Sequence, residues 1–199
     1  MGKDDRMVVR ELLMTAGAFF DYAALPENER RDLELHQGVI VEIPSASPLH
    51  GWIVMLFIQV ITRFLDLHPV AYIFGDSNDF VLSPGLVYKP DASVILKERL
   101  PSVPGRFHMA PDIAVEVISP SNSAAEISEK VENYLHHGSQ MVILIYTDPR
   151  TVRVCVANDD GTITLRTLTA EDWMDCGAVL PGFRVQVKAL FPDLPVETA

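Results

Sequence analysis

The sequence predicts an α/β domain built on a mixed sheet. Its clearest signal is the segment 112–146, in which two apolar runs, 112–118 and 141–146, flank a helical stretch and form a strand–helix–strand unit. Shorter runs separated by turn residues precede this unit, and a hairpin follows it. At 199 residues, 48% of them apolar, the chain is long enough for one domain with a substantial core.

Two elements are predicted near the N-terminus. Residues 1–9 are expected to be frayed, and the weakly periodic segment 8–25 indicates a short helix packed on the domain. The alternating runs 33–36 and 39–43 predict the two strands of a hairpin. Gly38 lies between them and supplies the unusual backbone angles that a tight turn requires.

A long helix is predicted over residues 49–67. Its apolar side chains lie almost all round the helix, which indicates either a central core helix or one that a partner subunit covers. Three short strands follow at 70–74, 80–82 and 92–96, separated by turn residues. The stretch 97–109 contains several Pro, Gly and Arg residues and is expected to be an exposed loop.

The second half of the chain begins with the strand–helix–strand unit. Ser123, with Glu126 three residues later, predicts a helix N-terminus closed by a capping box. The helix is expected to end before Gly138, a residue type that favours the left-handed conformation just past a helix. A hairpin is predicted over 151–168, and a last strand is predicted near 184–187.

Composition limits the functions that the chain can have. There are 16 Lys and Arg against 27 Asp and Glu, and the formal net charge of −11 argues against tight binding of nucleic acid by a broad basic face. Cys155 and Cys176 lack metal-binding or disulfide spacing and are expected to be reduced and buried. The most apolar run, 52–61, is too short to span a bilayer, so a soluble cytoplasmic protein is expected.

Two acidic residues have the context of a metal site. Asp91 follows Pro90 where a strand begins, and Glu116 lies inside the apolar strand 112–118. An acid within such a strand is costly to bury unless it is paired, hydrogen-bonded or bound to a metal. Two carboxylates that reach one point form an all-oxygen site for a hard cation such as Mg²⁺. An internal salt bridge of Glu116 is the alternative.

Lys130 lies on the following helix, beside its apolar stripe. From this position it can reach over the sheet towards Glu116, where its charge would orient an attacking water or stabilise the transition state of phosphodiester hydrolysis. The alternative is a surface pair with Glu126, four residues earlier on the same helix. The order of acid, acid and lysine is the layout of a metal-dependent phosphodiesterase.

Three further residues are weaker candidates for the site. Glu34 and Glu42 lie on the alternating strands of the first hairpin, so each points either into a cleft or to solvent. His50 opens the long helix and is a candidate for binding a water or a metal, although surface histidines are common at such positions. The other histidines lack the spacing of zinc ligands, and the sequence contains no Gly-rich phosphate loop.

An ordered set of motifs extends along most of the chain: Leu33-Glu34-Leu35-His36-Gln37-Gly38 with Glu42, the segment 44–50, Lys89-Pro90-Asp91, the segment 111–121, Glu129-Lys130 with Tyr134, and Leu180-Pro181-Gly182-Phe183. Together these motifs closely resemble a bacterial family of restriction endonucleases, once catalogued as a domain of unknown function and abundant in cyanobacteria. The resemblance covers about residues 10–192 and leaves 193–199 as a tail. It implies the fold of the PD-(D/E)XK nuclease superfamily, a restriction-endonuclease-like mixed sheet flanked by helices.

The resemblance also implies which residues form the site. Asp91 and Glu116 match the two motif acids and, with the backbone carbonyl of Val117, would hold Mg²⁺, for which Mn²⁺ can substitute. The motif lysine normally lies two residues after the second acid, where this chain has Ile118, so the strict motif is broken. Lys130 matches the lysine that this family carries on the following helix.

The upstream acid of the family is matched by either Glu34 or Glu42. The resemblance does not choose between them. His36 and Gln37 occupy positions where many relatives carry an acidic residue before the glycine, which is a departure from the family pattern.

The activity that the resemblance implies is a Mg²⁺-dependent endonuclease that hydrolyses DNA phosphodiester bonds without an organic cofactor. Binding of DNA is expected to be weak or transient because the net charge is −11. A homodimer is expected, because two sites suit the two strands of a duplex and the helix over 49–67 is apolar nearly all round. The alternative is a catalytically silent nuclease-fold protein used for binding or assembly, which the charge and the displaced lysine favour.

Overall fold

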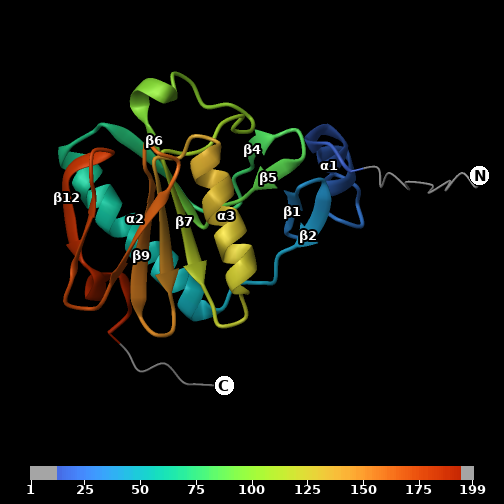
Figure 1. The fold of residues 1–199 in the computed structure, drawn as a ribbon. Coiled ribbons are helices and arrows are strands. Elements are labelled where there is room, and N and C mark those ends of the chain that lie inside the picture. The colour runs from blue at the N-terminus through green and yellow to red at the C-terminus, as the bar shows by residue number, and fades with distance from the viewer. Residues whose placement is uncertain (1–12, 194–199) are drawn as a thin grey trace, which may run out of the picture.

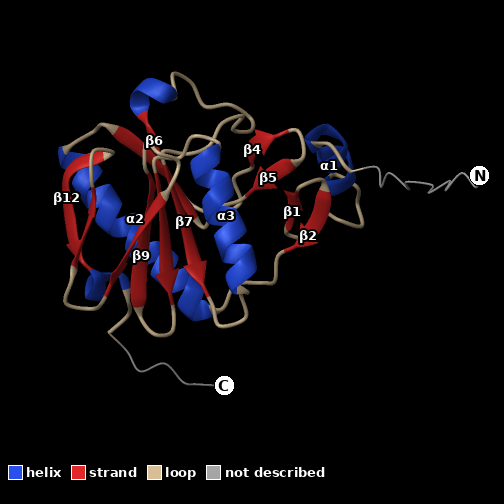
Figure 2. Cartoon of the chain, in the orientation of Figure 1, coloured by secondary structure: helices blue, strands red, loops and turns tan. Residues whose placement is uncertain are grey.

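The computed structural model describes residues 13–193 (Figure 1). The expected frayed N-terminus, residues 1–9, and all but the first residue of the expected tail, 193–199, lie outside the described residues. Within the described range the elements form an α/β arrangement of sheets and helices, as the sequence predicts (Figure 2).

The centre of the molecule is a mixed six-stranded sheet with a helix on each face (Figures 1 and 2). Strands β7 and β8 are parallel and are joined through helix α3, which confirms the predicted strand–helix–strand unit; the other neighbours are antiparallel. In spatial order the strands are β10(Ile163–Leu168), β9(Thr151–Ala157), β8(Met141–Tyr146), β7(Ile113–Ile118), β6(Ala92–Leu96) and β3(Ala71–Phe74).

Helices α2 and α3 cover opposite faces of this sheet. Helix α2(Pro48–Leu67) packs on one face together with the hairpin of β11(Trp173–Cys176) and β12(Leu180–Gln186) and the short helix η2(Val187–Leu190). Helix α3(Ala124–His136) packs on the other. It begins with the predicted capping box, which supplies partners for N–H groups that a helix start leaves free.

A second, four-stranded sheet lies beside the large one and carries helix α1(Ala16–Ala23) (Figure 1). The order of its strands is β2(Val39–Glu42), β1(Leu33–His36), β5(Leu86–Tyr88) and β4(Phe80–Ser83). The predicted hairpin turn is present, and Gly38 has a positive φ of 83°. A Cβ at this position would lie 2.6 Å from the Cβ of Leu13, so the close approach requires glycine.

Strand β7 contributes to the cores on both faces of the large sheet. Ile113, Val115 and Val117 belong to the cluster under α2. Ala114 and Ile118 belong to the cluster under α3, and by alternation Glu116 faces that side as well. The strand therefore directs one carboxylate into the layer between the sheet and α3.

Helix α2 is apolar nearly all round, but only one stripe of it is buried. Ile53, Phe57 and Ile61 are fully buried against the sheet, whereas Trp52 and Met55 remain 45% and 51% exposed. Among the described helices, α2 alone is long and apolar enough to cross a membrane by length and composition. Its packing against the sheet identifies it as a core helix whose outer side is exposed, with apolar residues at Trp52 and Met55 and polar residues at Gln59, Arg63 and Asp66.

The structure departs from the sequence prediction in a few elements. Helix α1 occupies residues 16–23, in the second half of the predicted segment 8–25, whose residues 8–12 lie outside the described part of the chain. Two strands were not predicted, β5 and β11, which have three and four residues. The expected loop 97–109 begins with a short helix, η1(Lys97–Arg99). Cys155 and Cys176 are free and buried, in agreement with the prediction.

Candidate metal centre

The structure places Asp91 and Glu116 side by side at the end of two antiparallel strands. The register of β6 and β7 pairs Ala92 with Val115, and one further step along both strands places Asp91 beside Glu116. Side chains that face each other across antiparallel strands have Cβ atoms about 5 Å apart. The Val117 N–H donates to Oδ2 of Asp91 at 2.6 Å, which holds this carboxylate at the edge of β7.

The carbonyl of Val117 faces the same side as Asp91. In an extended strand the N–H and C=O of one residue point to the same edge, and the Val117 N–H points to Asp91. The neighbouring carbonyl, that of Ile118, points the other way and accepts from Thr147 on the β8 side. The backbone thus directs the Val117 carbonyl toward the edge of β7 on which Asp91 lies.

Glu116 is a buried carboxylate with a raised pKa. Glu116 is only 7% exposed, and its Oε1 and Oε2 each lie 3.3 Å from Nζ of Lys130. The hydroxyl of Tyr134 donates to Oε1 at 2.8 Å. Burial raises the pKa of Glu116 to about 7; the charge of Lys130 opposes this shift, and the nearby negative charge of Asp91 adds to it.

Lys130 reaches the cluster from helix α3. Besides contacting Glu116, its Nζ donates to Oε1 of Glu34 at 3.1 Å. Burial works against its charge, but the two carboxylates outweigh burial and raise the pKa of Lys130 above its usual value. The alternative partner from sequence, Glu126, instead accepts from the N–H of Ser123 within the capping box.

Glu34 lies on strand β1, and its side chain reaches the cluster. Its side chain is 1% exposed, and its Oε1 accepts from the Lys89 N–H at 2.8 Å as well as from Lys130. Its Oε2 lies 2.7 Å from Nε2 of His36. Burial works to raise the pKa of Glu34, but the charge of Lys130 and these hydrogen bonds outweigh it and lower the pKa.

Of the two upstream acids left open by the sequence, the structure brings only Glu34 to the cluster. Glu42 lies elsewhere, at the end of β2, where its side chain is 52% exposed and its Oε2 accepts from Arg31 at 2.7 Å. Glu42 is therefore corrected from a candidate site residue to one member of a surface ion pair. The physical reason is alternation, because Glu34 and Glu42 lie on the two strands of the hairpin but face different surroundings.

His50 is the third of the weaker candidates and does lie at the cluster. Its Nε2 lies 2.9 Å from Oδ1 of Asp91, and this contact raises the pKa of His50. Ser47 caps helix α2 by accepting from the His50 N–H, so the first turn of the helix fixes the imidazole beside Asp91.

The charges of the cluster suit a cation. The carboxylates of Glu34 and Glu116 contact the ammonium of Lys130, and the negative charge of Asp91 lies close enough to Glu116 to affect its pKa. Within residues 13–193, no three His, Cys, Asp or Glu side chains are grouped closely enough to form a complete metal site. Two carboxylates with one carbonyl are nevertheless a fitting set for Mg²⁺, which keeps several waters and takes few protein oxygens.

Tyr134 is the residue of the cluster that sequence reasoning missed. The sequence places it in the apolar stripe of α3, and it is indeed fully buried. The available signal was its hydroxyl, since a buried tyrosine usually finds a hydrogen-bond partner. Position i+4 from Lys130 also puts it on the same face of the helix.

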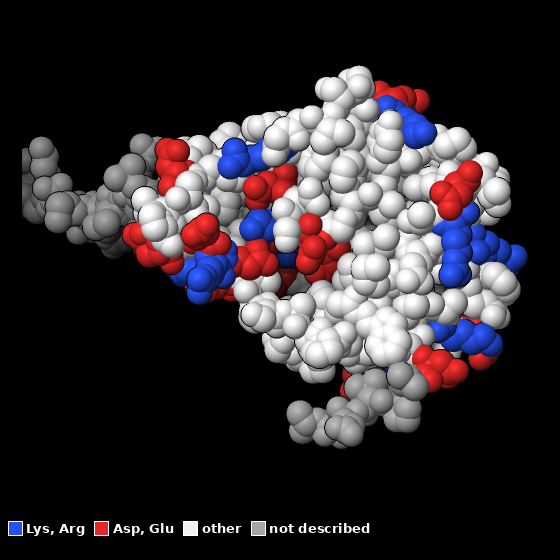
Figure 3. Space-filling model, turned by 180° about the vertical axis from the view of Figure 1, so that it is seen from behind, with Lys and Arg blue, Asp and Glu red and all other residues white. Residues whose placement is uncertain are grey.

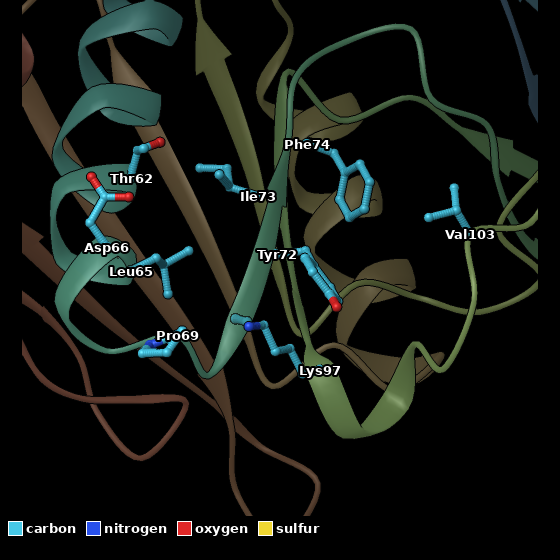
Figure 4. Close-up of a pocket in the computed structure, with 10 residues that line it drawn as sticks. Thr62, Leu65, Asp66, Pro69, Tyr72, Ile73, Phe74, Lys97 and Val103 are labelled. Atoms are coloured by element: carbon cyan, nitrogen blue, oxygen red, sulfur yellow. The ribbon is translucent and has the colours of Figure 1, made fainter.

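Two concavities lie outside this cluster. One, of about 360 Å³, lies between α2 and β3 and is lined mainly by apolar side chains such as Leu65, Tyr72 and Val103 (Figure 4). The other, of about 710 Å³, lies between α3 and strands β8 to β10. Neither brings together carboxylates and a lysine as the cluster does.

Charge on the surface is mixed. On the face opposite to that of Figure 1, Lys and Arg are interspersed with Asp and Glu, and the described residues form no continuous basic surface there (Figure 3). On the face shown, the mixed charge agrees with the net charge of −11, which argues against tight binding of nucleic acid through a broad basic face.

Comparison with known proteins gives the family. A family model described as "Putative restriction endonuclease", Uma2, matches residues 19–188. The chain belongs to the Uma2 family. The match contains every residue of the cluster, and it confirms the resemblance found in the sequence. No curated protein matches the chain.

A solved structure shares the Uma2 fold of this chain. It is the crystal structure of a protein from Anabaena variabilis ATCC 29413, described as a putative nuclease of a domain-of-unknown-function family. The TM-score is 0.77 at 24% identity, and the match covers 89% of this chain and 97% of the other. The similarity shows that the two chains share their fold over nearly their whole length.

Proposed function

We propose that the chain is a metal-dependent endonuclease that hydrolyses DNA phosphodiester bonds. The observation that carries the proposal is that Asp91 lies opposite Glu116 in the strand register, while Lys130 of helix α3 contacts both oxygens of Glu116. Burying the two acids Glu34 and Glu116 around one lysine is costly for stability, and such a cost is usual where a site serves chemistry. Membership of the Uma2 family supports the same reaction class.

Asp91, Glu116 and the carbonyl of Val117 are the groups that would hold Mg²⁺, or Mn²⁺ in its place. When bound, the metal would supply an acidified water and neutralise charge on the scissile phosphate. The chain's own contribution is to fix the two carboxylates: Asp91 through the Val117 N–H and His50, and Glu116 through Lys130.

Lys130 acts as a charged donor in this scheme. Its pKa is raised by the carboxylates around it, so the ammonium form persists at neutral pH and Lys130 does not serve as a general base. A fixed ammonium beside the phosphate orients the attacking water or stabilises the negative charge that develops in the transition state. The break in the strict motif at Ile118 is then without consequence, because the helix delivers the lysine that the strand lacks.

A plasmid cleavage assay tests the proposal. Supercoiled plasmid should be nicked or linearised in Mg²⁺ and left intact in EDTA. We expect Asp91→Asn and Lys130→Ala each to lower the rate by about 10²-fold or more. Glu42→Gln is the matched control, because Glu42 pairs with Arg31 outside the cluster, and it should cleave like the wild type.

Two outcomes of that assay contradict the proposal. Cleavage that survives EDTA would exclude the metal from the reaction. Equal rates for Lys130→Ala and the wild type would remove the role of the lysine.

The second candidate is a catalytically silent nuclease-fold protein used for binding or assembly. The net charge of −11 favours it, because such a charge weakens attraction to DNA. Absence of cleavage in the presence of bound Mn²⁺ would select this reading. Within our proposal, DNA is a substrate that the protein holds weakly or transiently, and the chain forms a homodimer. We also propose a cytoplasmic location, which the two free cysteines support.

A further inference from the structure

The two oxygens of Glu116 differ in their surroundings. Oε1 accepts from the Tyr134 hydroxyl at 2.8 Å and lies 3.3 Å from Nζ of Lys130. Oε2 has the lysine contact alone, also at 3.3 Å. The shortest of these contacts is therefore the hydrogen bond from the neutral Tyr134 hydroxyl, and it is made to Oε1 alone.

The ring of Tyr134 is itself held in place. It is fully buried and packs on the ring of Tyr88 with a centroid separation of 5.3 Å. The hydroxyl of Tyr88 accepts from Nδ2 of Asn133 at 2.8 Å, which ties β5 to the same face of α3. Tyr88 immediately precedes the segment Lys89-Pro90-Asp91, so one aromatic pair locks the helix that carries Lys130 to the strand that leads into Asp91.

We propose that Tyr134 is a positioning residue, which pins Oε1 of Glu116 and leaves Oε2 directed to the cation. Lys130 cannot set this orientation, because its Nζ is equally distant from both oxygens. The hydroxyl of Tyr134 removes the symmetry and fixes the rotation of the carboxylate. This inference rests on the proposed metal-dependent function, and it concerns a residue that does not itself touch the metal or the substrate.

Binding of Mn²⁺ to the DNA-free protein tests the role of Tyr134 without recourse to activity. Tyr134→Phe keeps the ring and removes the one hydrogen bond to Glu116. Loss of a group that orients a metal ligand lowers metal affinity by about 10–100-fold, and we expect titration calorimetry to show a drop in this range. Tyr146→Phe is the matched control, because the Tyr146 hydroxyl accepts from Arg153 and makes no contact with the cluster.

Replacement by noncanonical residues separates the hydrogen bond from packing. At position 134, p-aminophenylalanine retains a donor and should bind Mn²⁺ like the wild type. In contrast, p-methylphenylalanine fills the space of the hydroxyl without donating and should bind as weakly as Tyr134→Phe. This pair also decides the question if Tyr134→Phe does not fold, and a thermal melt of each variant establishes which of them are folded.

The outcomes distinguish this inference from the function on which it rests. Wild-type affinity in Tyr134→Phe, with loss of binding in Asp91→Asn, overturns the role of Tyr134 and leaves the metal site intact. Equal affinities of the two noncanonical variants also overturn it. Failure of the wild type itself to bind Mn²⁺ overturns both the inference and the metal-dependent function.

Discussion

At the scale of single residues, the cost of burying charge singled out one candidate, Glu116, from the sequence. Glu116 stands out in the sequence because an acid in an apolar strand needs a partner, and the structure supplies Lys130 and Tyr134. Asp91 could be found only through its motif context, since an aspartate after proline is ordinary in turns. Neither pattern nor motif could separate Glu34 from Glu42, because that choice depends on how the small sheet lies against α3.

The ionisation of Glu116 gives a prediction at this scale. Its pKa is raised to about 7 from the 4.5 of an exposed glutamate, so between these two values the folded chain holds a proton that the unfolded chain has released. The stability that this proton confers is fully present below about pH 4.5 and is lost as pH rises through about 7. The unfolding free energy of the wild type should therefore fall across this window.

The variant Glu116→Gln has no carboxyl proton to lose at position 116, so it isolates the effect of Glu116 ionisation on stability. In EDTA, urea denaturation at several pH values should show the variant gaining stability relative to the wild type as pH rises, by about 1.4 kcal/mol for each pKa unit of the shift. Glu34 affects stability in the opposite direction. Because its pKa is lowered in the folded chain, its stabilising contribution is present above the usual pKa of a glutamate and is lost as pH falls through the lowered value. Parallel curves for the two proteins would show that Glu116 is not protonated in the fold.

At the scale of elements, long periodic segments were predicted well, whereas two short strands, β5 and β11, were missed. The capping box placed the start of α3 at Ser123, and the structure contains both of its hydrogen bonds. Strand β5 has three residues between a Pro-Gly turn and Pro90, too few for a period to be read. It is held by its neighbours β1 and β4 rather than by its own pattern. The same holds for β11, because it is its pairing with β12 that defines it as a strand.

Helix α3 gives a prediction at this scale, because it carries both Lys130 and Tyr134 to the cluster. Ser123→Ala removes the side chain that accepts from the Glu126 N–H and should lower the unfolding free energy by about 1 kcal/mol. Urea denaturation at neutral pH measures the change. Ser128→Ala is the control, since Ser128 lies exposed in the helix interior, where alanine is the better helix former. If both variants lose the same stability, the cap is not the cause.

At the scale of the whole molecule, the sequence predicted the layers of the fold but not the coverage of α2. A 3.6-residue period distinguishes a buried stripe from an exposed one only when the outer residues are polar. In α2 the outer residues of the first half are apolar, and the structure buries Ile53, Phe57 and Ile61 while leaving Trp52 and Met55 exposed. The exposed pair lies at the same end of the helix as His50 and hence near the candidate metal centre.

The last prediction concerns assembly through this end of α2. An exposed apolar surface beside the site favours a homodimer, in which two sites face the two strands of one duplex. Light scattering at micromolar concentration should then give twice the 22.1 kDa of one chain. Trp52→Glu places a charge in the apolar half of the exposed stripe and should reduce the mass to one chain. Gln59→Glu, in the polar half of that stripe, should leave it unchanged. A wild-type mass of one chain would contradict the dimer, and cleavage of both strands would then require two independent encounters with DNA.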